Sequence, residues 1–236
     1  MSDPHDELLA RDFSVIARQL QAEDGAGPTQ DRITRTATHT VDGCDHAAIS
    51  LVVHNGVIRT VAATDDVPVR VDALQYEVRE GPCLDSIRTH DVFMTGDLAV
   101  ESRWPRSAAR AAAETGVRSM LAVRLFLGGD TIGALNLYSR TADAFDDHSC
   151  AVAAILAAHG AVALTAVQHE RRAEQLASAL ESNRRIGVAM GVLMAREHVD
   201  EDEAFALLRR ASQRLNLKLR DVADQVVETG RAPHVR

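Results

Sequence analysis

Residues 120–138 have the sequence MLAVRLFLGGDTIGALNLY, and this stretch decides the fold class of the first part of the chain. Every second residue of its first half is strongly apolar: Leu121, Val123, Leu125 and Leu127. A period of two is typical of a strand with one face in a core. Gly128, Gly129 and Asp130 interrupt the pattern before a second β-rich run, residues 131–138. We therefore expect two antiparallel strands joined by a turn.

A second hairpin is predicted nearer the N-terminus. Residues 47–53 and 57–63 are β-rich and are separated by Asn55 and Gly56. Asn-Gly is the strongest short hairpin signal, because both central residues of a two-residue type I′ turn need positive φ.

Helical patterns surround the hairpins. Leu9, Phe13, Ile16 and Leu20 predict an amphipathic helix over residues 5–22. Further helices are predicted over residues 29–41 and over residues 104–114, the second ended by Gly116. Residues 69–79 and 82–88 look helical or irregular, and residues 92–95 look like a short strand. Residues 1–145 therefore have an α+β pattern with antiparallel strands, not the βαβ alternation of a parallel sheet.

A long helix is predicted from Asp146, which can cap its first turn. No proline interrupts the chain before Pro233. Apolar or small residues recur at steps of four and three, which is the coiled-coil period. This seam consists of Ile155, His159, Val162, Ala166, His169, Ala173, Leu176, Leu180, Asn183, Gly187, Met190 and Met194. Its polar members weaken pairing while fixing its register. We expect a signalling helix that pairs in a homodimer; the alternative is a long helix packed on its own domain.

Two shorter helices end the chain. Asp200 with Glu203 forms a capping-box pattern before one of them. Gly230 is placed to end the other, with Pro233 following. The apolar stripe of the first helix consists of Ala204, Leu207, Leu208, Ala211 and Leu215.

Three segments of this C-terminal part resemble the ANTAR domain, a three-helix module that binds RNA in transcription antitermination. They are NRRIGVAMGVLMAR (183–196), EAFALLRRAS (203–212) and NLKLRDVA (216–223). The part before them resembles a GAF domain through EGPC (80–83), Asp97-Leu98, Arg103-Trp104-Pro105, GVRS (116–119) and IGALNLY (132–138). The resemblance implies a GAF-like sensor over residues 1–145, a coiled-coil-like connecting helix over 146–182 and an ANTAR module over 183–236.

The ANTAR resemblance implies binding of paired stem-loops in a nascent transcript, which prevents a competing terminator hairpin. A homodimer suits two loops, because linked modules gain affinity through effective concentration. Arginine pairs with phosphate and stacks on splayed bases. The candidate RNA-binding residues are Arg184, Arg185, Ala189, Gly191, Arg196, Arg209, Arg210, Ser212, Arg214, Asn216, Lys218 and Arg220. Met190 and Leu217 depart from the family, which often has basic residues there.

Charge is distributed unevenly. Residues 1–170 contain 14 Lys+Arg and 24 Asp+Glu, a balance of −10, whereas residues 171–236 contain 12 and 10, a balance of +2. The asymmetry favours a polyanionic partner for the C-terminal part.

In the sensor part, the ligand or sensing candidates are Cys83, Trp104 and Asn136. Cys83 follows Pro82 at a possible helix start, where a thiol pKa can fall, so a redox input is one hypothesis and an unidentified small ligand another. Packing is the alternative role for both Cys83 and Trp104.

The motifs exclude the common enzyme classes. The chain has no nucleophile elbow, P-loop or metal-ligand histidine spacing, and none of its three cysteines forms a C-x-x-C pair. We expect no catalytic activity, no cofactor and no bound metal. A GAF-like methionine sulfoxide reductase would need further reactive cysteines, and Cys44 and Cys150 are not placed for that.

The chain also lacks a signal peptide pattern. No apolar run approaches the roughly 18–20 residues that span a bilayer; residues 150–167 come nearest. A cytoplasmic protein is therefore expected. The main alternative function is a DNA-binding transcription factor with a GAF sensor, since three short helices with arginines can also fit a helix-turn-helix.

Overall fold

The computed structural model describes Ser14 and residues 26–89, 91–231 and 233. The helix predicted over residues 5–22 lies outside them apart from Ser14. The chain divides into two compact units, residues up to Gln168 and residues from His169 onward.

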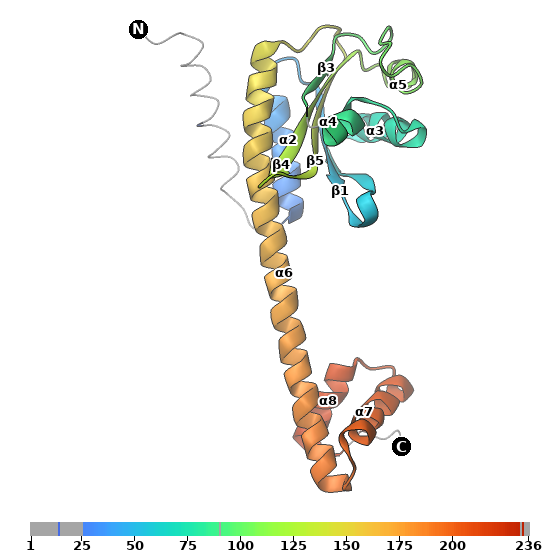
Figure 1. Cartoon of the computed structure of the whole chain (residues 1–236), viewed down its shortest axis with the longest axis vertical. Helices are drawn as coiled ribbons and strands as arrows, with labels where there is room; N and C mark the ends of the chain where they lie inside the picture. The colour runs from blue at the N-terminus through green and yellow to red at the C-terminus, as the bar shows by residue number, and fades with distance from the viewer. Residues whose placement is uncertain (1–13, 15–25, 90, 232, 234–236) are drawn as a thin grey trace. The chain divides into compact units, whose positions relative to one another are not determined.

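The N-terminal unit is built on a five-stranded sheet flanked by helices (Figure 1). Its elements in chain order are α2 (Ala26–Thr40), β1 (His46–Val52), β2 (Ile58–Ala63), α3 (Asp66–Val78), α4 (Pro82–Thr89), β3 (Phe93–Thr95), α5 (Ala108–Thr115), β4 (Ser119–Leu127), β5 (Asp130–Ser139) and the first part of α6 (Asp147–Glu197).

The strand order is β2-β1-β5-β4-β3, and all neighbouring strands are antiparallel. This confirms the predicted antiparallel α+β fold. The two faces of the sheet follow the strand period. Leu135 and Leu137 face a core shared with α2 and α6, whereas Ala134 and Tyr138 face a core shared with α3, α4 and α5. The sheet is therefore covered on both faces.

The first hairpin turn is longer than predicted. Asn55 and Gly56 have positive φ values of 63° and 74°, as expected. However, Val53 accepts the amide of Gly56 and donates to Val57, and His54–Gly56 forms a 3-10 turn. The connection thus has three residues rather than a two-residue type I′ turn.

Two further details differ from the sequence prediction. Helix α5 begins at Ala108, not at Trp104, because the amides of Arg106 and Ser107 bind the Glu80 carboxylate in a turn before the helix. The alternation in β4 also ends early. A register shift follows Leu125, and Leu127 is 39% exposed.

Helix α6 begins where the cap was predicted, because Asp146 Oδ1 accepts the Ser149 amide at 2.8 Å. It runs without interruption for 51 residues. By length and composition it could cross a membrane, which the sequence analysis did not indicate, and 39% of its most apolar window is buried. The buried residues, among them Val152, Leu156 and Leu164, pack against the sheet.

The C-terminal unit contains the last part of α6, α7 (Glu201–Leu215) and α8 (Leu219–Thr229). Only one of the two hydrogen bonds of the predicted capping box is present at the start of α7. Asp200 Oδ1 accepts the Glu203 amide at 2.9 Å, but the Glu203 carboxylate accepts from Arg210 instead of returning to Asp200. Gly230, with φ 74°, ends α8 as expected. The three helices enclose a core of Ala189, Leu193, Ala204, Leu208, Ala211, Val222, Ala223 and Val226.

The centre of the sheet has no room for a side chain at position 133. A Cβ on Gly133 would overlap the Ser50 carbonyl oxygen and lie 3.0 Å from Leu51 Cα, both in the neighbouring strand β1. Because these are backbone atoms, Gly133→Ala is expected to destabilise the N-terminal unit by roughly 1–3 kcal/mol.

Fluorescence of Trp104, the only tryptophan and buried in this unit, measures that unfolding during denaturant titration. Gly191→Ala adds the same methyl group to the C-terminal unit, where nothing lies within 4 Å, and should leave the Trp104 transition unchanged. An unchanged midpoint for Gly133→Ala would show that the sheet can shift to admit the methyl group.

Candidate functional sites

Three polar residues of α3 point toward the sheet. Asp72, Gln75 and Tyr76 follow the i, i+3, i+4 spacing that places side chains on one helical face. They join polar residues of the covered sheet face in one buried polar cluster, which consists of Ser50, Thr60, Asp72, Gln75, Tyr76, Cys83, Asn136 and Tyr138. The cluster connects α3 and α4 to strands β1, β2 and β5.

The Asp72 carboxylate is the centre of this cluster, and it has no exposed surface. Its Oδ1 accepts from Tyr138 at 2.5 Å and from Gln75 at 3.2 Å. Its Oδ2 accepts from Thr60 at 2.7 Å and from Ser50 at 3.2 Å. Burial nevertheless raises the pKa of Asp72 to about 6, because the loss of solvation outweighs the four donors. A single buried carboxyl therefore titrates close to neutral pH.

Two of the three predicted sensing residues belong to this cluster. Asn136 donates to Cys83 Sγ at 3.1 Å and to Ser50 at 3.0 Å, and its own Oδ1 is buried with no hydrogen-bond partner among the described residues. Burial raises the pKa of Cys83 to about 12. That direction is opposite to the lowered pKa of an activated thiolate, so the geometry does not support the redox hypothesis.

Trp104, the third candidate, lies elsewhere in the same core. Its Nε1 donates to Asp85 at 2.7 Å, and its ring packs edge-on against Phe93. Packing accounts for its position. Asp72, Gln75 and Tyr76 were not predicted from the sequence. Their helical spacing, in a segment that looked helical or irregular, was the signal that could have identified them.

The titration of Asp72 has a consequence for stability. Its pKa rises from 3.8 to about 6 on folding, so the folded protein binds this proton more tightly than the unfolded chain does. Protonation of Asp72 contributes ~3 kcal/mol to the free energy of unfolding. This contribution is complete below pH 4 and is lost as the pH rises to about 6. Relative to Asp72→Asn, the free energy of unfolding of the wild type should fall over this range.

Denaturant titrations followed by Trp104 fluorescence at several pH values give this difference. Asp97→Asn is the control. Arg118 holds the pKa of Asp97 at about 2, so its contribution changes only below pH 4, and its profile should parallel that of the wild type from pH 4 to 7. Parallel profiles for wild type and Asp72→Asn would contradict the assignment.

In the C-terminal unit, seven of the eight predicted RNA-binding cations fall into two groups. Arg209, Arg214 and Lys218 are exposed, and their side chains form no ion pair within the described part of the chain. The others pair with carboxylates: Arg184 with Glu181, Arg185 with Glu181 and Asp224, Arg210 with Glu203, and Arg220 with Asp221. Among the predicted RNA-binding residues, the cations without an ion pair to a described residue are thus mainly on α7 and at the start of α8.

Several of the remaining candidates have structural roles. Ala189 is fully buried in the three-helix core. Asn216 ends α7 with φ 52°, and the Ser212 hydroxyl donates to the Leu217 carbonyl at 2.7 Å in the same turn. Arg196 donates to the Gly230 carbonyl at 3.4 Å. Gly191 is exposed, with open space around its Cα.

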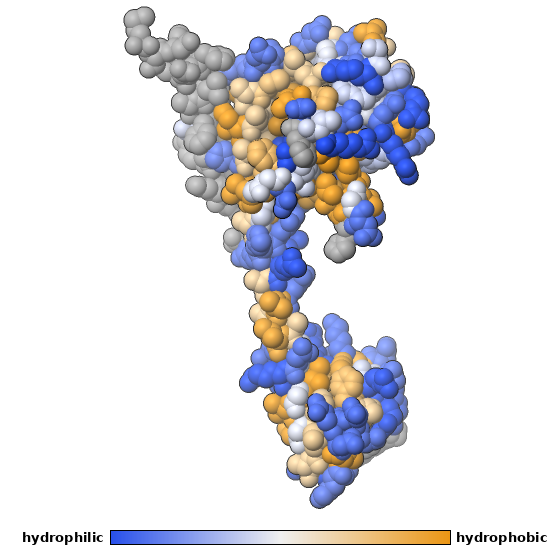
Figure 2. All heavy atoms as spheres, viewed as in Figure 1, coloured by the Kyte–Doolittle hydropathy of each residue, from blue (hydrophilic) through white to orange (hydrophobic). Residues whose placement is uncertain are grey.

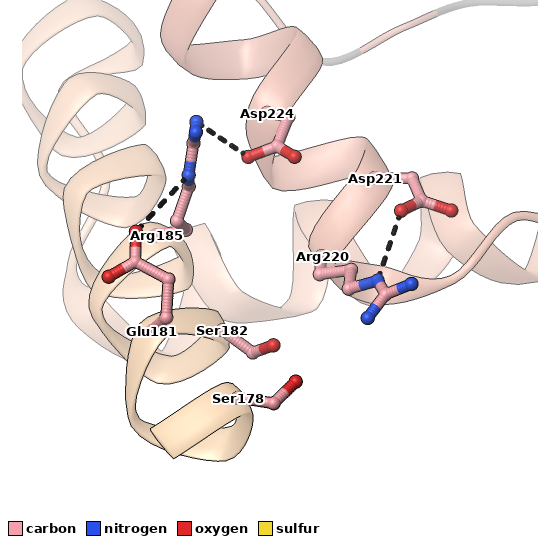
Figure 3. A pocket seen from close by; sticks show the side chains of 7 residues that line it. All are labelled: Ser178, Glu181, Ser182, Arg185, Arg220, Asp221 and Asp224. Atoms are coloured by element: carbon pink, nitrogen blue, oxygen red, sulfur yellow. Dashed lines mark hydrogen bonds and ion pairs between the residues drawn. The ribbon is translucent and has the colours of Figure 1, made fainter. Parts of the chain in front are cut away.

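A polar cleft of about 370 Å³ lies between α6 and α8 (Figure 3). Its lining consists of Ser178, Glu181, Ser182, Arg185, Arg220, Asp221 and Asp224. Arg185 Nη1 lies 2.9 Å from Asp224 Oδ1, and Arg220 Nε lies 3.3 Å from Asp221 Oδ1. The two arginines were predicted from the sequence, whereas the acidic and serine residues of the lining were not named.

Comparison with protein families gave two matches on this chain. A GAF domain model matches residues 29–165, and an ANTAR domain model matches residues 174–227. The first covers more than half of the chain, and the second covers most of the three-helix unit. A search of curated proteins gave no significant match.

Solved GAF domains share the fold of the N-terminal unit. The GAF domain of a phosphoenolpyruvate-protein phosphotransferase from Coxiella burnetii has a TM-score of 0.57 and 12% identity, covering 72% of this chain and 99% of that one. The corresponding domain from Acinetobacter has a TM-score of 0.52 and 14% identity, and the match covers 72% of this chain and 97% of that one. The cyanobacteriochrome TePixJ GAF domain has a TM-score of 0.52 and 15% identity, and the match covers 64% of this chain and 96% of that one. At these identities the likeness concerns the fold alone.

Proposed function

The chain belongs to the GAF domain family and contains an ANTAR domain, and on this premise we propose that it is a cytoplasmic, signal-responsive antiterminator that binds paired stem-loops in nascent RNA. The single observation that carries the proposal is the ANTAR match over residues 174–227. Holding the paired stem-loops would keep the transcript from folding into a terminator hairpin. The proposed parts are a sensor over 1–145, a connecting helix over 146–182 and an RNA-binding module over 183–236.

The distribution of cations supports RNA as the ligand. Arg209, Arg214 and Lys218 are available for phosphate without breaking an ion pair within the described residues. RNA loops are bound through phosphates and splayed bases, and the guanidinium group can contact both. A regulatory rather than catalytic role is consistent with both domain families.

The exposed seam of α6 supports a homodimer (Figure 2). Leu176 and Leu180 are 62% and 63% exposed, and Val162 is 54% exposed. Figure 2 shows hydrophobic side chains at the surface of this middle stretch of the helix. Exposed leucines at coiled-coil spacing would be buried by the same seam of a second copy. Two modules in one dimer could then bind two loops, and their linkage would raise the affinity through effective concentration.

Competition binding tests the proposed function. The full chain is mixed with a labelled tandem stem-loop RNA, and unlabelled tandem RNA, single stem-loop RNA and duplex DNA of equal length compete at one fixed salt concentration. Salt is fixed because counterion release makes every such affinity depend on it. The tandem RNA should compete best. Equal or better competition by duplex DNA would favour a DNA-binding factor instead.

A paired variant tests which cations contribute. Arg209→Ala with Arg214→Ala should weaken tandem RNA binding and reduce the dependence of log affinity on log salt by roughly 1–2, because about two phosphate contacts are lost. Arg59→Ala, an exposed change in the N-terminal unit, is the control.

The dimer has a separate test. Leu176→Glu with Leu180→Glu places two charges on the seam and should convert a dimer into a monomer in sedimentation equilibrium. The helix should stay folded, because both side chains are exposed within one chain. The affinity for tandem RNA should fall toward that for a single stem-loop.

Gln175→Glu with Ala179→Glu is the matched control, since it adds the same two charges to exposed positions beside the seam. It should leave the dimer intact. Dissociation by both pairs of substitutions, or by neither, would show that the seam is not the interface.

A further inference from the structure

The chemistry of the polar cleft between α6 and α8 differs from that of a phosphate site. It contains two arginines, Arg185 and Arg220, and three carboxylates, Glu181, Asp221 and Asp224, which gives a net charge of −1. A phosphate group there would face more negative than positive charge. The cleft therefore suits a neutral group that donates hydrogen bonds.

Asp224 is an acceptor held in a fixed place. Its Oδ1 is covered and lies 2.9 Å from Arg185 Nη1, an ion pair that does not satisfy the geometry of a hydrogen bond. The side chain as a whole is 40% exposed, and Oδ2 accepts no hydrogen bond from any residue that the structure describes. Arg185 thus positions the carboxylate while its second oxygen stays available.

Glu181 differs from Asp224 in this respect. Both of its oxygens accept from Arg184, each at 3.1 Å, and Oε1 also lies 3.6 Å from Arg185. The hydrogen bond from Arg184 lowers the pKa of Glu181. Its acceptor capacity is largely used. Asp221 already accepts a hydrogen bond from Arg220, so Asp224, to which no described residue donates a hydrogen bond, is the acceptor that a ligand would find.

The remaining lining offers a stacking surface and hydroxyl groups. Arg220 pairs only with its neighbour Asp221 within the described residues, and its side chain is 50% exposed. Ser178 and Ser182 project from α6 into the space toward α8, and neither hydroxyl is hydrogen-bonded to a described residue (Figure 3). A planar guanidinium beside free acceptors and hydroxyls fits a planar ring with polar edges.

From this arrangement we infer that the cleft binds one unpaired base of the RNA loop through the base's amino edge, with Asp224 as the acceptor and Arg220 against the ring. Splayed loop bases are recognised in this way, by stacking on arginine and by hydrogen bonds to their edges. Acidic side chains accept from base amino groups. The inference rests on the proposed RNA-binding function and adds a specificity-determining residue to it. Adenine, cytosine and guanine have an exocyclic amino group, and uracil has none.

Selection from a tandem stem-loop RNA with randomised apical loops tests the inference. The pool is bound to the full chain at fixed salt, and bound and unbound RNA are sequenced. The wild type should deplete uracil about tenfold at one loop position, the discrimination expected from a weak to moderate base contact. Asp224→Ala should lose this depletion and keep the preferences at the other positions.

Asp202→Ala is the matched control, because it removes one exposed carboxylate from α7 outside the cleft. It should keep the depletion of uracil while raising affinity for all RNAs about as much as Asp224→Ala does. Circular dichroism melts establish that both variants are folded. A third variant, Asp224→Asn, presents an amide that can both donate and accept, and should readmit uracil.

The outcomes separate this inference from the function on which it rests. If RNA is bound but the wild type shows no discrimination against uracil, or Asp224→Ala retains it, the cleft does not bind a base. The same conclusion follows if Asp224→Ala tightens every RNA equally without changing a preference, because Asp224 then only competes with phosphate. If no RNA is bound at all, the proposed function fails together with the inference.

Discussion

The burial of one face of α6 is the interaction on which both units depend. Val152, Leu156 and Leu164 pack near its start against the sheet, and Ala189 and Leu193 pack near its end in the three-helix core. Hydrophobic burial is the main favourable contribution to each unit. Between these ends the helix has a stretch whose leucines are exposed within one chain. Stability thus comes from the two ends, and the middle is available for pairing.

The N-terminal unit has an unusual core on the other side of its sheet. Asp72 and seven other polar side chains meet there instead of apolar contacts alone, and a buried polar cluster of this kind is costly wherever a hydrogen-bond partner is missing. Asn136 Oδ1 is such a place. Burial raises the pKa of Asp72 to about 6, so this face of the sheet contains a carboxyl that can change its protonation state near neutral pH.

Local patterns predicted the elements well and the long-range contacts poorly. The alternation of Leu121, Val123 and Leu125 predicted a strand, and the caps at Asp146 and Asp200 predicted helix starts, because each depends on neighbours in sequence. The predicted start of α5 was wrong, because the residues before this helix bind the carboxylate of Glu80, which lies in a turn distant in sequence. The turn type predicted after Val53 was also wrong, because the two residues with positive φ lie in a three-residue connection and not in a two-residue turn.

The candidate sites show the same division. Cys83 and Asn136 were named, but Asp72, to which burial gives its unusual pKa, is hydrogen-bonded by residues up to 66 positions away. No single stretch of sequence could indicate that meeting. The position of Ala189 along its helix is compatible with either a surface or a core residue. It is buried because α7 and α8 pack against that face of α6. Asp224, the partner of Arg185 on α8, likewise becomes visible only when α8 lies beside α6.

Transcription in vitro is the most direct test of the central claim. A template places a tandem stem-loop that the protein binds so that its second stem overlaps an intrinsic terminator, and read-through by purified RNA polymerase is measured as protein is added. The account predicts that read-through rises over the concentration range in which the protein binds the RNA, and that it does not rise when the apical loops are replaced. Unchanged or increased termination at saturating protein would contradict it.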